Sequence, residues 1–569
     1  MHSSRARCLL ALVALVALVA MTAGSVAASA SGQSGPRFYA DDPIWRDNDR
    51  VVDVRRAREI KLDDYYDFIE NSLTRPGDRS KIRALNVNTL DEVPDSSWFT
   101  NRIGRRDMSV AELVTGPDRP VTFSGAWTIV RGKNRGFQPG FRAVDPADPT
   151  GTVYQLEVDP PGHPEMATGA EVIGTAFYHA FGYHTVDVYL TTIDPNRLRI
   201  APDATIRDAN GRRPFTHGDL QEILKNAARR SDGRIRVSAE RFLDGDDMGR
   251  FEYHGTRDDD PNDIYPHEHR RELRGSRVFA AWLNHDDSRA VNTMVMRHRD
   301  NGKRYLKYYI VDFGSLLGSA TRFADGPQSG REHALAVKPS LLTFLSFGLY
   351  VRPWLRAAPP EGPPAVGRFN ADRFDPRAWV AEYPKAAYDN MRDDDAFWAA
   401  RIVARFSDED IRAIVSKARY SDPAATDALT NALIRRRDRI KDTWLTGVTP
   451  ITDVRLAPDG TLTFDNVAVR HGVGSAASGY GLTWSRFDNA SGIHAPLGAE
   501  VISEIPPATA PIESFGDADY VSVSIRVIAS GPGWRPVTAY FRRTPRGWQT
   551  VGLDRELPAS PAAGAGTSD

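Results

Sequence analysis

The sequence predicts an α+β protein, because three kinds of pattern follow one another along the chain. Residues 119–195 alternate apolar and polar side chains in short runs separated by glycine and proline turns, which is typical of strands. Residues 196–447 show mostly helical periodicity, clearest at 272–283 and 426–445. Short alternating runs return at 448–558, so we expect a small β domain near the end of the chain.

The first 30 residues have the features of a secretory signal peptide. Arg5 and Arg7 precede an apolar run from Cys8 to about Ala23, and small residues follow as far as Ala30. A membrane anchor is the alternative, but the run is short for a spanning helix, which needs about 20 apolar residues. A lipoprotein cysteine would lie at the end of such a run, whereas Cys8 lies at its start. We therefore expect an exported protein, periplasmic or extracellular.

The composition argues against several classes of protein. The chain has 73 Lys and Arg against 74 Asp and Glu, whereas a nucleic-acid-binding protein should show a basic excess. After the leader no apolar run reaches 18 residues, so we expect no transmembrane segment once the signal is cleaved. Residues 31–118 form an N-terminal cap segment with no visible chemistry. The tail, 559–569, has the small polar residues typical of disorder.

The residues that could carry chemistry gather around one predicted hairpin. Two strand-like runs flank Asn301-Gly302, a strong hairpin signal. A turn centred there places Asn292 opposite Val311 and therefore beside Asp312. Asp287 lies in the loop that leads into the first strand. Two carboxylates and one amide oxygen then meet at one end of the hairpin, and Mg²⁺ accepts such ligands together with substrate phosphates. The alternative is an ordinary polar turn, where Asp and Asn are common.

These residues also carry a family resemblance. His285-x-Asp287-x-x-x-x-Asn292 resembles the catalytic loop of protein kinases, and Asp312-Phe313-Gly314 resembles their D-F-G motif. The residues before them, from Arg270, look like those of atypical bacterial secreted kinase-like proteins, which are similar to CotH-type spore-coat-protein kinases and more distantly to HipA-type kinases.

The resemblance covers about 120–445. It implies a two-lobed protein-kinase-like fold with an N-lobe at 119–195 and a helical C-lobe at 196–447. By this resemblance Asp287 would be the catalytic aspartate, Asn292 and Asp312 would be metal ligands, and Mg²⁺ and ATP would be the cofactors.

The strand-rich half matches the kinase pattern less well. A kinase N-lobe needs a glycine-rich loop, a lysine on the third strand and a glutamate on the following helix. Gly132, Gly136 and Gly140 are candidates for the loop, although their four-residue spacing is not G-x-G-x-x-G and ordinary turn glycines are the alternative. Glu171 lies on a predicted helix, 165–181, where the pairing glutamate is expected. The third strand carries Glu157 where relatives would carry lysine, and Lys133 could supply the missing amine from a neighbouring strand.

The sequence leaves two functions open. In the first, Lys133 points toward Asp312, and the protein binds a metal and a nucleotide and transfers a phosphoryl group to a hydroxyl. In the second, Lys133 points to solvent, and the protein is an inactive pseudokinase scaffold that binds an exported protein or an envelope polymer. Export weakens the first function, because ATP is scarce outside the cytoplasm. The roles of Glu157 and His285 stay open.

Overall fold

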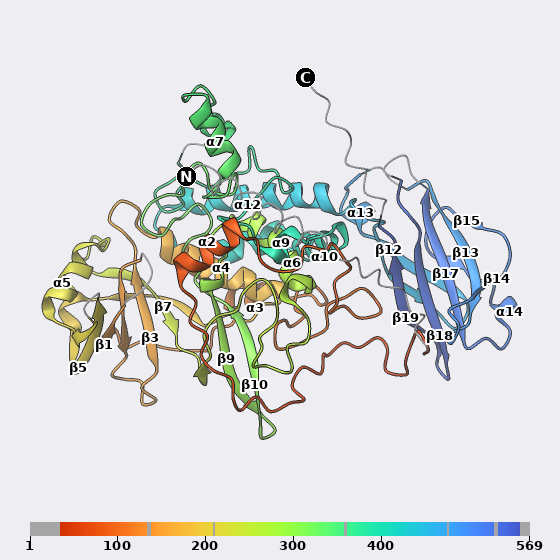
Figure 1. Cartoon of the computed structure of the whole chain (residues 1–569), viewed down its shortest axis with the longest axis horizontal. Helices are drawn as coiled ribbons and strands as arrows, with labels where there is room; N and C mark the ends of the chain where they lie inside the picture. Colours follow the sequence, from red (N-terminus) through yellow and green to blue (C-terminus); the bar gives the residue numbers. More distant parts are fainter. Residues whose placement is uncertain are drawn as a thin grey trace, which may run out of the picture.

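The computed structural model of the protein describes residues 35–133, 138–208, 211–357, 361–474, 477–528 and 533–557. It is a mixed α+β structure, 26% helix and 25% strand, with several sheets (Figure 1). The expected leader, the expected tail and Gly136 lie outside the described residues. Within those ranges, no helix has the length and apolar character needed to cross a membrane.

A seven-stranded mixed sheet forms one end of the molecule, with the strand order β4-β7-β3-β2-β1-β5-β6 (Figure 1). Strands β1 and β5 pair in parallel, and the other neighbours are antiparallel. The strands are β1 (Trp127–Gly132), β2 (Gly140–Val144), β3 (Val153–Val158), β4 (Val188–Ile193), β5 (Leu198–Asp208), β6 (Gly211–Pro214) and β7 (Ile235–Arg241).

The sheet continues well past residue 195, where the sequence placed the end of the strand-rich unit. Strands β5, β6 and β7 belong to it, and only helix α5 (His217–Lys225) interrupts them. Strands β5 and β6 form one edge, where mostly solvent-facing polar side chains and Pro202 mask the alternation that marks a strand. The helical region therefore begins after Arg241.

Helix α4 (Met166–Phe181) joins this sheet to the helical body, close to its predicted bounds. Nearly all its residues are buried, because it packs on β3, β4 and β7 on one side and on helices on the other. Gly174 allows one close approach: a Cβ there would lie 2.6 Å from the Cβ of Phe313. Helix α4 thereby holds Glu171 next to the segment that follows the predicted hairpin.

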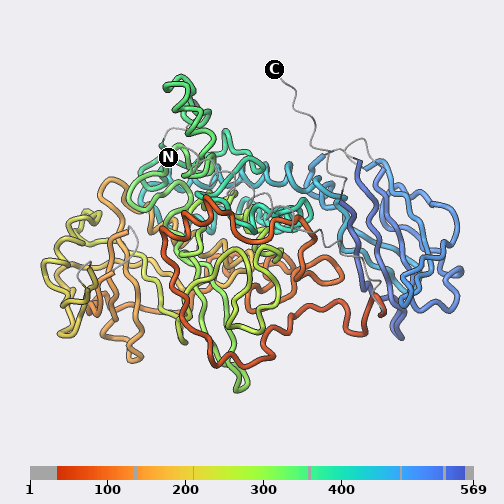
Figure 2. Tube along the Cα trace, in the orientation of Figure 1, coloured from red at the N-terminus to blue at the C-terminus, as the bar shows by residue number. Residues whose placement is uncertain are grey.

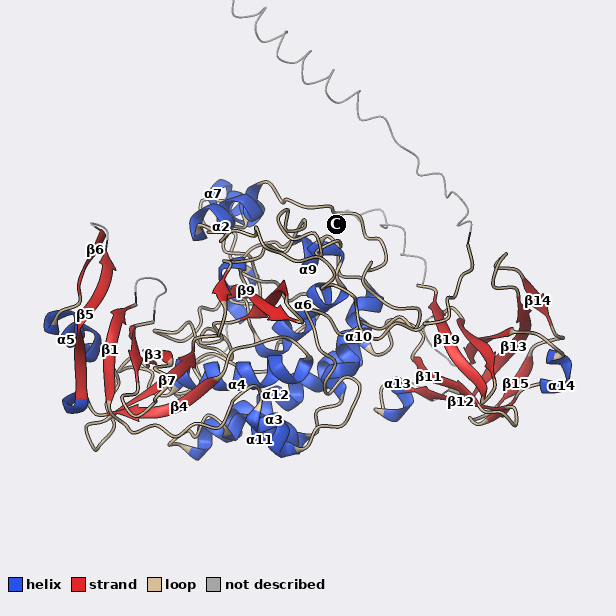
Figure 3. Cartoon of the chain, turned by 90° about the horizontal axis from the view of Figure 1, so that it is seen from below, coloured by secondary structure: helices blue, strands red, loops and turns tan. Residues whose placement is uncertain are grey.

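The helical body contains the largest hydrophobic core (Figure 3). Helices α6 and α10 approach closely, since a Cβ at Gly275 would lie 2.7 Å from the Trp398 ring. Helix α12 packs on α6, α10 and α11. The elements are α6 (Arg271–Leu283), β8 (Asp246–Asp247), β9 (Thr293–Asp300), β10 (Lys303–Ile310), α7 (Val337–Leu345), α8 (Pro353–Ala357), α9 (Ala386–Asp389), α10 (Asp393–Ala404), α11 (Asp408–Ser416) and α12 (Pro423–Trp444).

Residues 451–555 form the antiparallel β unit that the sequence predicted, with its own core. One sheet has the order β11-β12-β16, and the larger one β14-β13-β17-β18-β19, with β15 also on β13. The elements are β11 (Ile451–Leu456), β12 (Thr461–Asn466), α13 (Val467–Arg470), β13 (Gly479–Phe487), β14 (His494–Pro496), β15 (Val501–Ser503), β16 (Ala508–Thr509), α14 (Ile512–Phe515), β17 (Tyr520–Ile528), β18 (Val537–Thr544) and β19 (Gly547–Arg555).

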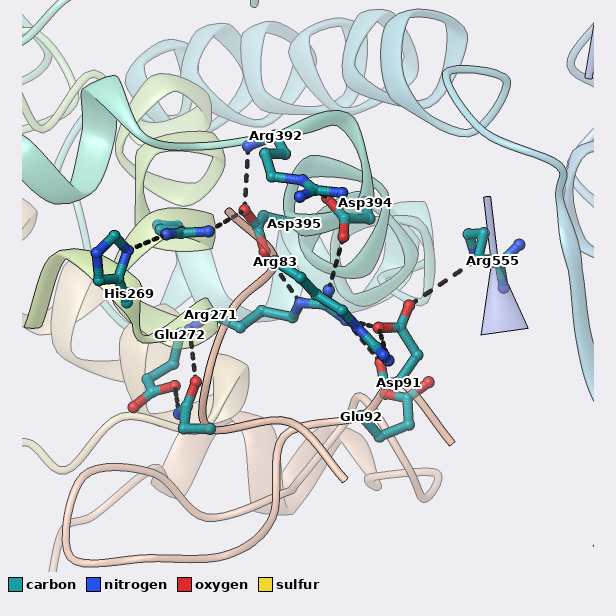
Figure 4. A network of polar contacts seen from close by, with 12 residues as sticks. Arg83, Asp91, Glu92, His269, Arg271, Glu272, Arg392, Asp394, Asp395 and Arg555 are labelled. Carbon is teal, nitrogen blue, oxygen red and sulfur yellow. Dashed lines mark hydrogen bonds and ion pairs between the residues drawn. The ribbon is translucent and has the colours of Figure 1, made fainter. Parts of the chain in front are cut away.

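The N-terminal segment, 35–118, is part of the core and spans much of the molecule (Figure 2). It contains α2 (Asp64–Leu73) and α3 (Val110–Thr115). Phe38 packs against aromatic rings of the β unit, and Trp98 stacks on Tyr308 of β10 with ring centroids 3.6 Å apart. Asp91 joins a buried ion network around Arg271 and two aspartates of α10 (Figure 4). The segment thus links the β unit, the hairpin and the helical body.

Candidate functional site

The predicted hairpin exists in the predicted register. Strands β9 and β10 pair from Asp300↔Lys303 to Thr293↔Ile310. One step further, the Val311 N–H donates to the Asn292 carbonyl at 3.1 Å. The end of the hairpin therefore brings Asn292 next to the chain that leads into Asp312, as the sequence predicted.

The loop before β9 is held by its own polar groups. The Asn292 side-chain amide donates to the Asp287 carbonyl oxygen at 2.7 Å. Since Nδ2 is engaged in this way, Oδ1 is the atom of Asn292 that can ligate a metal. The Asp287 carboxylate forms an ion pair with Arg289 and accepts a hydrogen bond from Ser315 Oγ at 2.9 Å. The loop thus fixes both Asp287 and Asn292.

The segment after β10 has a strained backbone and a buried anchor. Asp312 adopts a φ of 65°, a left-handed conformation that is uncommon for a residue other than glycine. Phe313 is fully buried, and its ring lies 4.7 Å from that of Tyr178 on α4. Asp312 itself is exposed to solvent. The buried Phe313 therefore fixes an accessible carboxylate at the end of the hairpin.

His285 contacts the two aromatic residues, Tyr178 and Phe313, that pack behind Asp312. Its Nδ1 lies 2.8 Å from the Tyr178 hydroxyl, and its ring packs against Phe313. Burial lowers the pKa of His285 to about 3, and the positive charges of Lys385 and Arg289 act in the same direction. The imidazole is neutral at physiological pH, so its place in the motif is one of packing and positioning.

Lys133 reaches the site from the end of β1. Gly132 pairs with Phe141 and Gly140 pairs with Glu157, so Lys133, Gly140 and Glu157 lie in a row across three strands. Because Gly140 has no side chain, Lys133 can extend across β2, where it forms an ion pair with Glu157. Glu157, which the kinase resemblance led us to expect as a lysine, is thus paired with an amine that comes from the end of β1 across β2.

The charge of Asp312 also affects the pKa of the Lys133 amine. Burial lowers the pKa of Lys133, but the negative charges of Glu157 and Asp312 outweigh it, so that the net pKa is raised. Lys133 is therefore directed into the site. Its ion pair is with Glu157 and not with Glu171, the partner that the sequence suggested.

Of the glycines expected in a phosphate-binding loop, the structure describes Gly132 and Gly140 but not Gly136. Gly132 lies inside β1, and a Cβ there would lie 2.7 Å from Ile206 of β5, so this glycine serves strand packing. Gly136 falls outside the described residues, and its loop role stays a prediction.

Several carboxyl groups crowd around this point. The protein packed around Asp312 removes much of the water near its carboxyl group although the residue still has open surface, and this desolvation, followed by the charge of Glu157, raises the pKa of Asp312 to about 6. Burial, followed by the charges of Glu157 and Asp312, raises the pKa of Glu240 on β7 to about 8. Burial and the charges of Asp312 and Glu240 raise the pKa of Glu171 well above its usual value. The site holds more carboxyl groups than its nearby cations can neutralise.

Sequence reasoning missed Glu240 and Lys385. Glu240 lies on a strand that the sequence assigned to the helical region. Lys385 is fully buried, and its amine donates to the backbone oxygen and hydroxyl of Ser288, next to Asp287. Burial lowers the pKa of Lys385 to about 7, although Asp287 and other nearby carboxylates oppose this shift. No local motif marks either residue, because each reaches the site only through the fold.

The oxygen atoms of Asn292 and Asp312 suit a metal ion that takes its remaining ligands from water or substrate. The described residues hold no cluster of three or more His, Cys, Asp or Glu able to bind a metal ion by itself. Asn292 and Asp312 would offer two oxygens, which fits Mg²⁺, because this ion usually takes one or two protein ligands together with waters and substrate phosphates.

Comparison with known proteins adds no assignment. No family model matches the chain, and neither the curated proteins nor the solved structures contain a significant match. The functional argument therefore depends on the geometry of the site.

Proposed function

We propose that this chain is an exported, two-lobed protein-kinase-like protein that binds Mg²⁺ and ATP and transfers a phosphoryl group to a hydroxyl acceptor. The observation that carries the proposal is the meeting of Lys133, paired with Glu157, and Asp312 at one place. They come from the seven-stranded sheet and from the end of the β9–β10 hairpin. A triphosphate with its metal needs such an amine opposite a metal-binding carboxylate.

Each residue has a defined role in this proposal. Asn292 and Asp312 hold Mg²⁺ through oxygen atoms, and Lys133 contacts the phosphates. Asp287, fixed beside Asn292, orients the acceptor hydroxyl. Glu171, buried on α4 beside Asp312, supports the phosphate-binding side together with Lys133; a cation bound at Asp312 would favour the ionised form of Glu171, whose pKa burial raises.

The charge of the site supports a bound cation. Burial, and after it the charges of neighbouring carboxylates, raise the pKa values of Asp312, Glu240 and Glu171. A divalent cation would relieve this repulsion and would separate Glu157 from the phosphates. Without a cation, a triphosphate would meet a net negative surface.

Thermal melting tests the proposal. The chain from residue 31 is melted alone, with Mg²⁺, with ATP and EDTA, and with Mg²⁺ and ATP together. A ligand that binds only the folded state stabilises it by RT ln(1 + [L]/Kd), so even weak specific binding is visible at millimolar ATP. We expect a rise in melting temperature only with Mg²⁺ and ATP together.

The matched variants are Asp312→Asn and Asp300→Asn. Asparagine tolerates the left-handed backbone of Asp312, so this variant removes the charge and keeps the local conformation. Asp300 lies at the far, exposed end of the same hairpin. We expect Asp312→Asn to lose the Mg²⁺-dependent rise and Asp300→Asn to keep it. No rise in the wild-type chain would refute the nucleotide site.

A second candidate function is an inactive scaffold that binds an exported protein or an envelope polymer. One observation favours it: Arg289 and Ser315 engage both oxygens of the Asp287 carboxylate. The Arg289 guanidinium and the Ser315 hydroxyl both stabilise the ionised form of this carboxylate, so Asp287 is a weaker base toward a hydroxyl than a free carboxylate would be. The variant Arg289→Gln decides between the two. If release of Asp287 increases phosphate transfer or ATP hydrolysis, the site is catalytic; if nucleotide binds and neither protein turns it over, the scaffold is favoured.

A further inference from the structure

Helix α7 and the residues that follow it expose an unusual amount of apolar surface. The segment stands above the rest of the chain (Figures 1 and 2), and no residue of α7 is buried. Phe344 is 78% exposed, Phe347 97% and Leu349 86%. Val337, Leu341, Leu342, Leu345, Val351 and Leu355 are also exposed. Soluble proteins rarely leave such a contiguous apolar patch in water without a partner for it.

The tip of this segment is strained as well as exposed. Phe347 adopts a φ of 52°, and Gly348 follows with a φ of 84°. A left-handed backbone is unfavourable for a bulky aromatic residue and is usually kept only where function requires it. The turn directs Phe347 outward at the end of α7, so backbone strain and apolar exposure occur at the same residue.

The base of the segment is firmly built. Glu332 forms an ion pair with Arg352 and accepts a hydrogen bond from Trp354 Nε1 at 3.1 Å. Two backbone hydrogen bonds connect this base to the loop before β9. The Ala334 N–H donates to the Glu382 carbonyl at 2.7 Å, and the Glu382 N–H donates to the Asp286 carbonyl at 3.0 Å. The apolar tip is therefore presented on a fixed stalk that rests beside the loop containing Asp287.

The charge pattern indicates what the tip contacts. From residue 333 to residue 360 the sequence has no Asp or Glu, while Lys338, Arg352 and Arg356 are basic. Lys338 is exposed and has no ion pair within the part of the chain that the structure describes. Tyr350 and Trp354 lie half-buried near the base, and such aromatic residues favour the membrane–water interface. An apolar tip with basic and aromatic residues behind it matches a bilayer surface rich in anionic headgroups.

We propose that residues 337–355 form an interfacial anchor that inserts its apolar tip into an anionic lipid bilayer. Phe344, Phe347 and Leu349 enter the acyl boundary, and Lys338 contacts headgroup phosphates. A convex tip whose side chains are almost fully exposed suits a soft bilayer better than a preformed protein groove. The inference goes beyond nucleotide binding and does not depend on it. It places the loop containing Asp287 close to the lipid surface.

Vesicle sedimentation tests this anchor. The chain from residue 31 is used, because the apolar run before it would bind lipid by itself. The vesicles are phosphatidylcholine alone and phosphatidylcholine mixed with phosphatidylglycerol. We expect binding to the mixed vesicles, and at least about a tenfold lower partition coefficient for the double variant Phe347→Ser, Leu349→Ser. Ile493→Ser, Ile505→Ser, a pair of exposed apolar residues in the β unit, should bind like wild type.

A single dye gives an independent readout. The chain from residue 31 has no cysteine, so Phe347→Cys and Ile505→Cys can each carry one environment-sensitive fluorophore. We expect a blue shift with mixed vesicles only at position 347, and Lys338→Glu should weaken it. Equal sedimentation of wild type and the double serine variant would overturn the proposal, as would no wild-type binding to either vesicle. A dimer that the double variant converts to a monomer, without lipid binding, would assign the tip to a second copy instead.

Discussion

Replacing Glu240 with glutamine should stabilise the chain at pH 8 and change its stability little at pH 5. Glu240 lies on β7, opposite Gln155 of β3, and its carboxyl group is part of the crowded site. Burial and the charges of Glu157 and Asp312 raise its pKa from 4.5 to about 8. Glutamine keeps the shape of the side chain and cannot ionise, so the variant removes only the charge.

The size of the effect follows from the shift in pKa. Since the folded pKa lies above the unfolded one, the folded chain holds the proton more tightly. This contribution to stability is complete below about pH 4.5 and is lost as the pH rises toward 8. One pKa unit corresponds to about 1.4 kcal/mol, so the full shift would correspond to about 5 kcal/mol. The side chain is partly exposed, and solvent screening reduces the expected loss between pH 5 and pH 8 to about 2–3 kcal/mol.

Melting curves between pH 5 and pH 8 in EDTA measure this difference. The wild-type melting temperature should fall more steeply with pH than that of Glu240→Gln, and the two curves should meet near pH 5. Glu222→Gln is the matched control, because Glu222 lies exposed on α5, between strands β6 and β7 of the same sheet. If Glu240→Gln follows the wild-type curve throughout, the carboxyl groups of the site do not repel one another as described.

Two further substitutions test the packing of the core and of the site. Arg271→Met should destabilise the chain by about 3–5 kcal/mol in urea unfolding, because it removes the buried cation that Asp91, Asp394 and Asp395 share (Figure 4); Arg412→Met, which breaks an exposed pair, should change stability by less than about 1 kcal/mol. Gly174→Ala should displace Phe313, lower the free energy of unfolding by about 1–3 kcal/mol and weaken the rise in melting temperature with Mg²⁺ and ATP. Gly162→Ala has open space around it and should change neither quantity. A Gly174→Ala variant with wild-type stability would contradict the close contact with Phe313.

Local signals predicted the hairpin and its register. Asn301 and Gly302 both adopt positive φ values, 48° and 80°, as a tight turn between paired strands requires. Once that turn is placed, the period of the strands dictates that Asn292 meets Val311. Counting residues from the turn needs no knowledge of the rest of the fold, and this explains why the meeting of Asn292 with the chain before Asp312 could be predicted.

The other half of the site depends on contacts between distant segments. Glu240 lies on β7, which pairs with both β3 and β4. Strands β5 and β6 separate β7 from these two strands in the sequence. Lys385 arrives from the loop before α9 and meets Ser288 across the core. Neither residue has a signal in its own neighbours, since what matters is which strands and loops the fold places side by side.

Under the proposed kinase-like fold, Glu157 shows why one missing motif residue is weak grounds for inactivity. That proposal expects a lysine where the sequence has Glu157. In the sheet, however, Lys133 lies two strands away in the same row, and Gly140 between them has no side chain to block it. A phosphate responds to where a positive charge lies and not to which strand carries it. The ion pair of Lys133 with Glu157 keeps that charge near Asp312, so the proposed site has its amine from the end of β1 and not from β3.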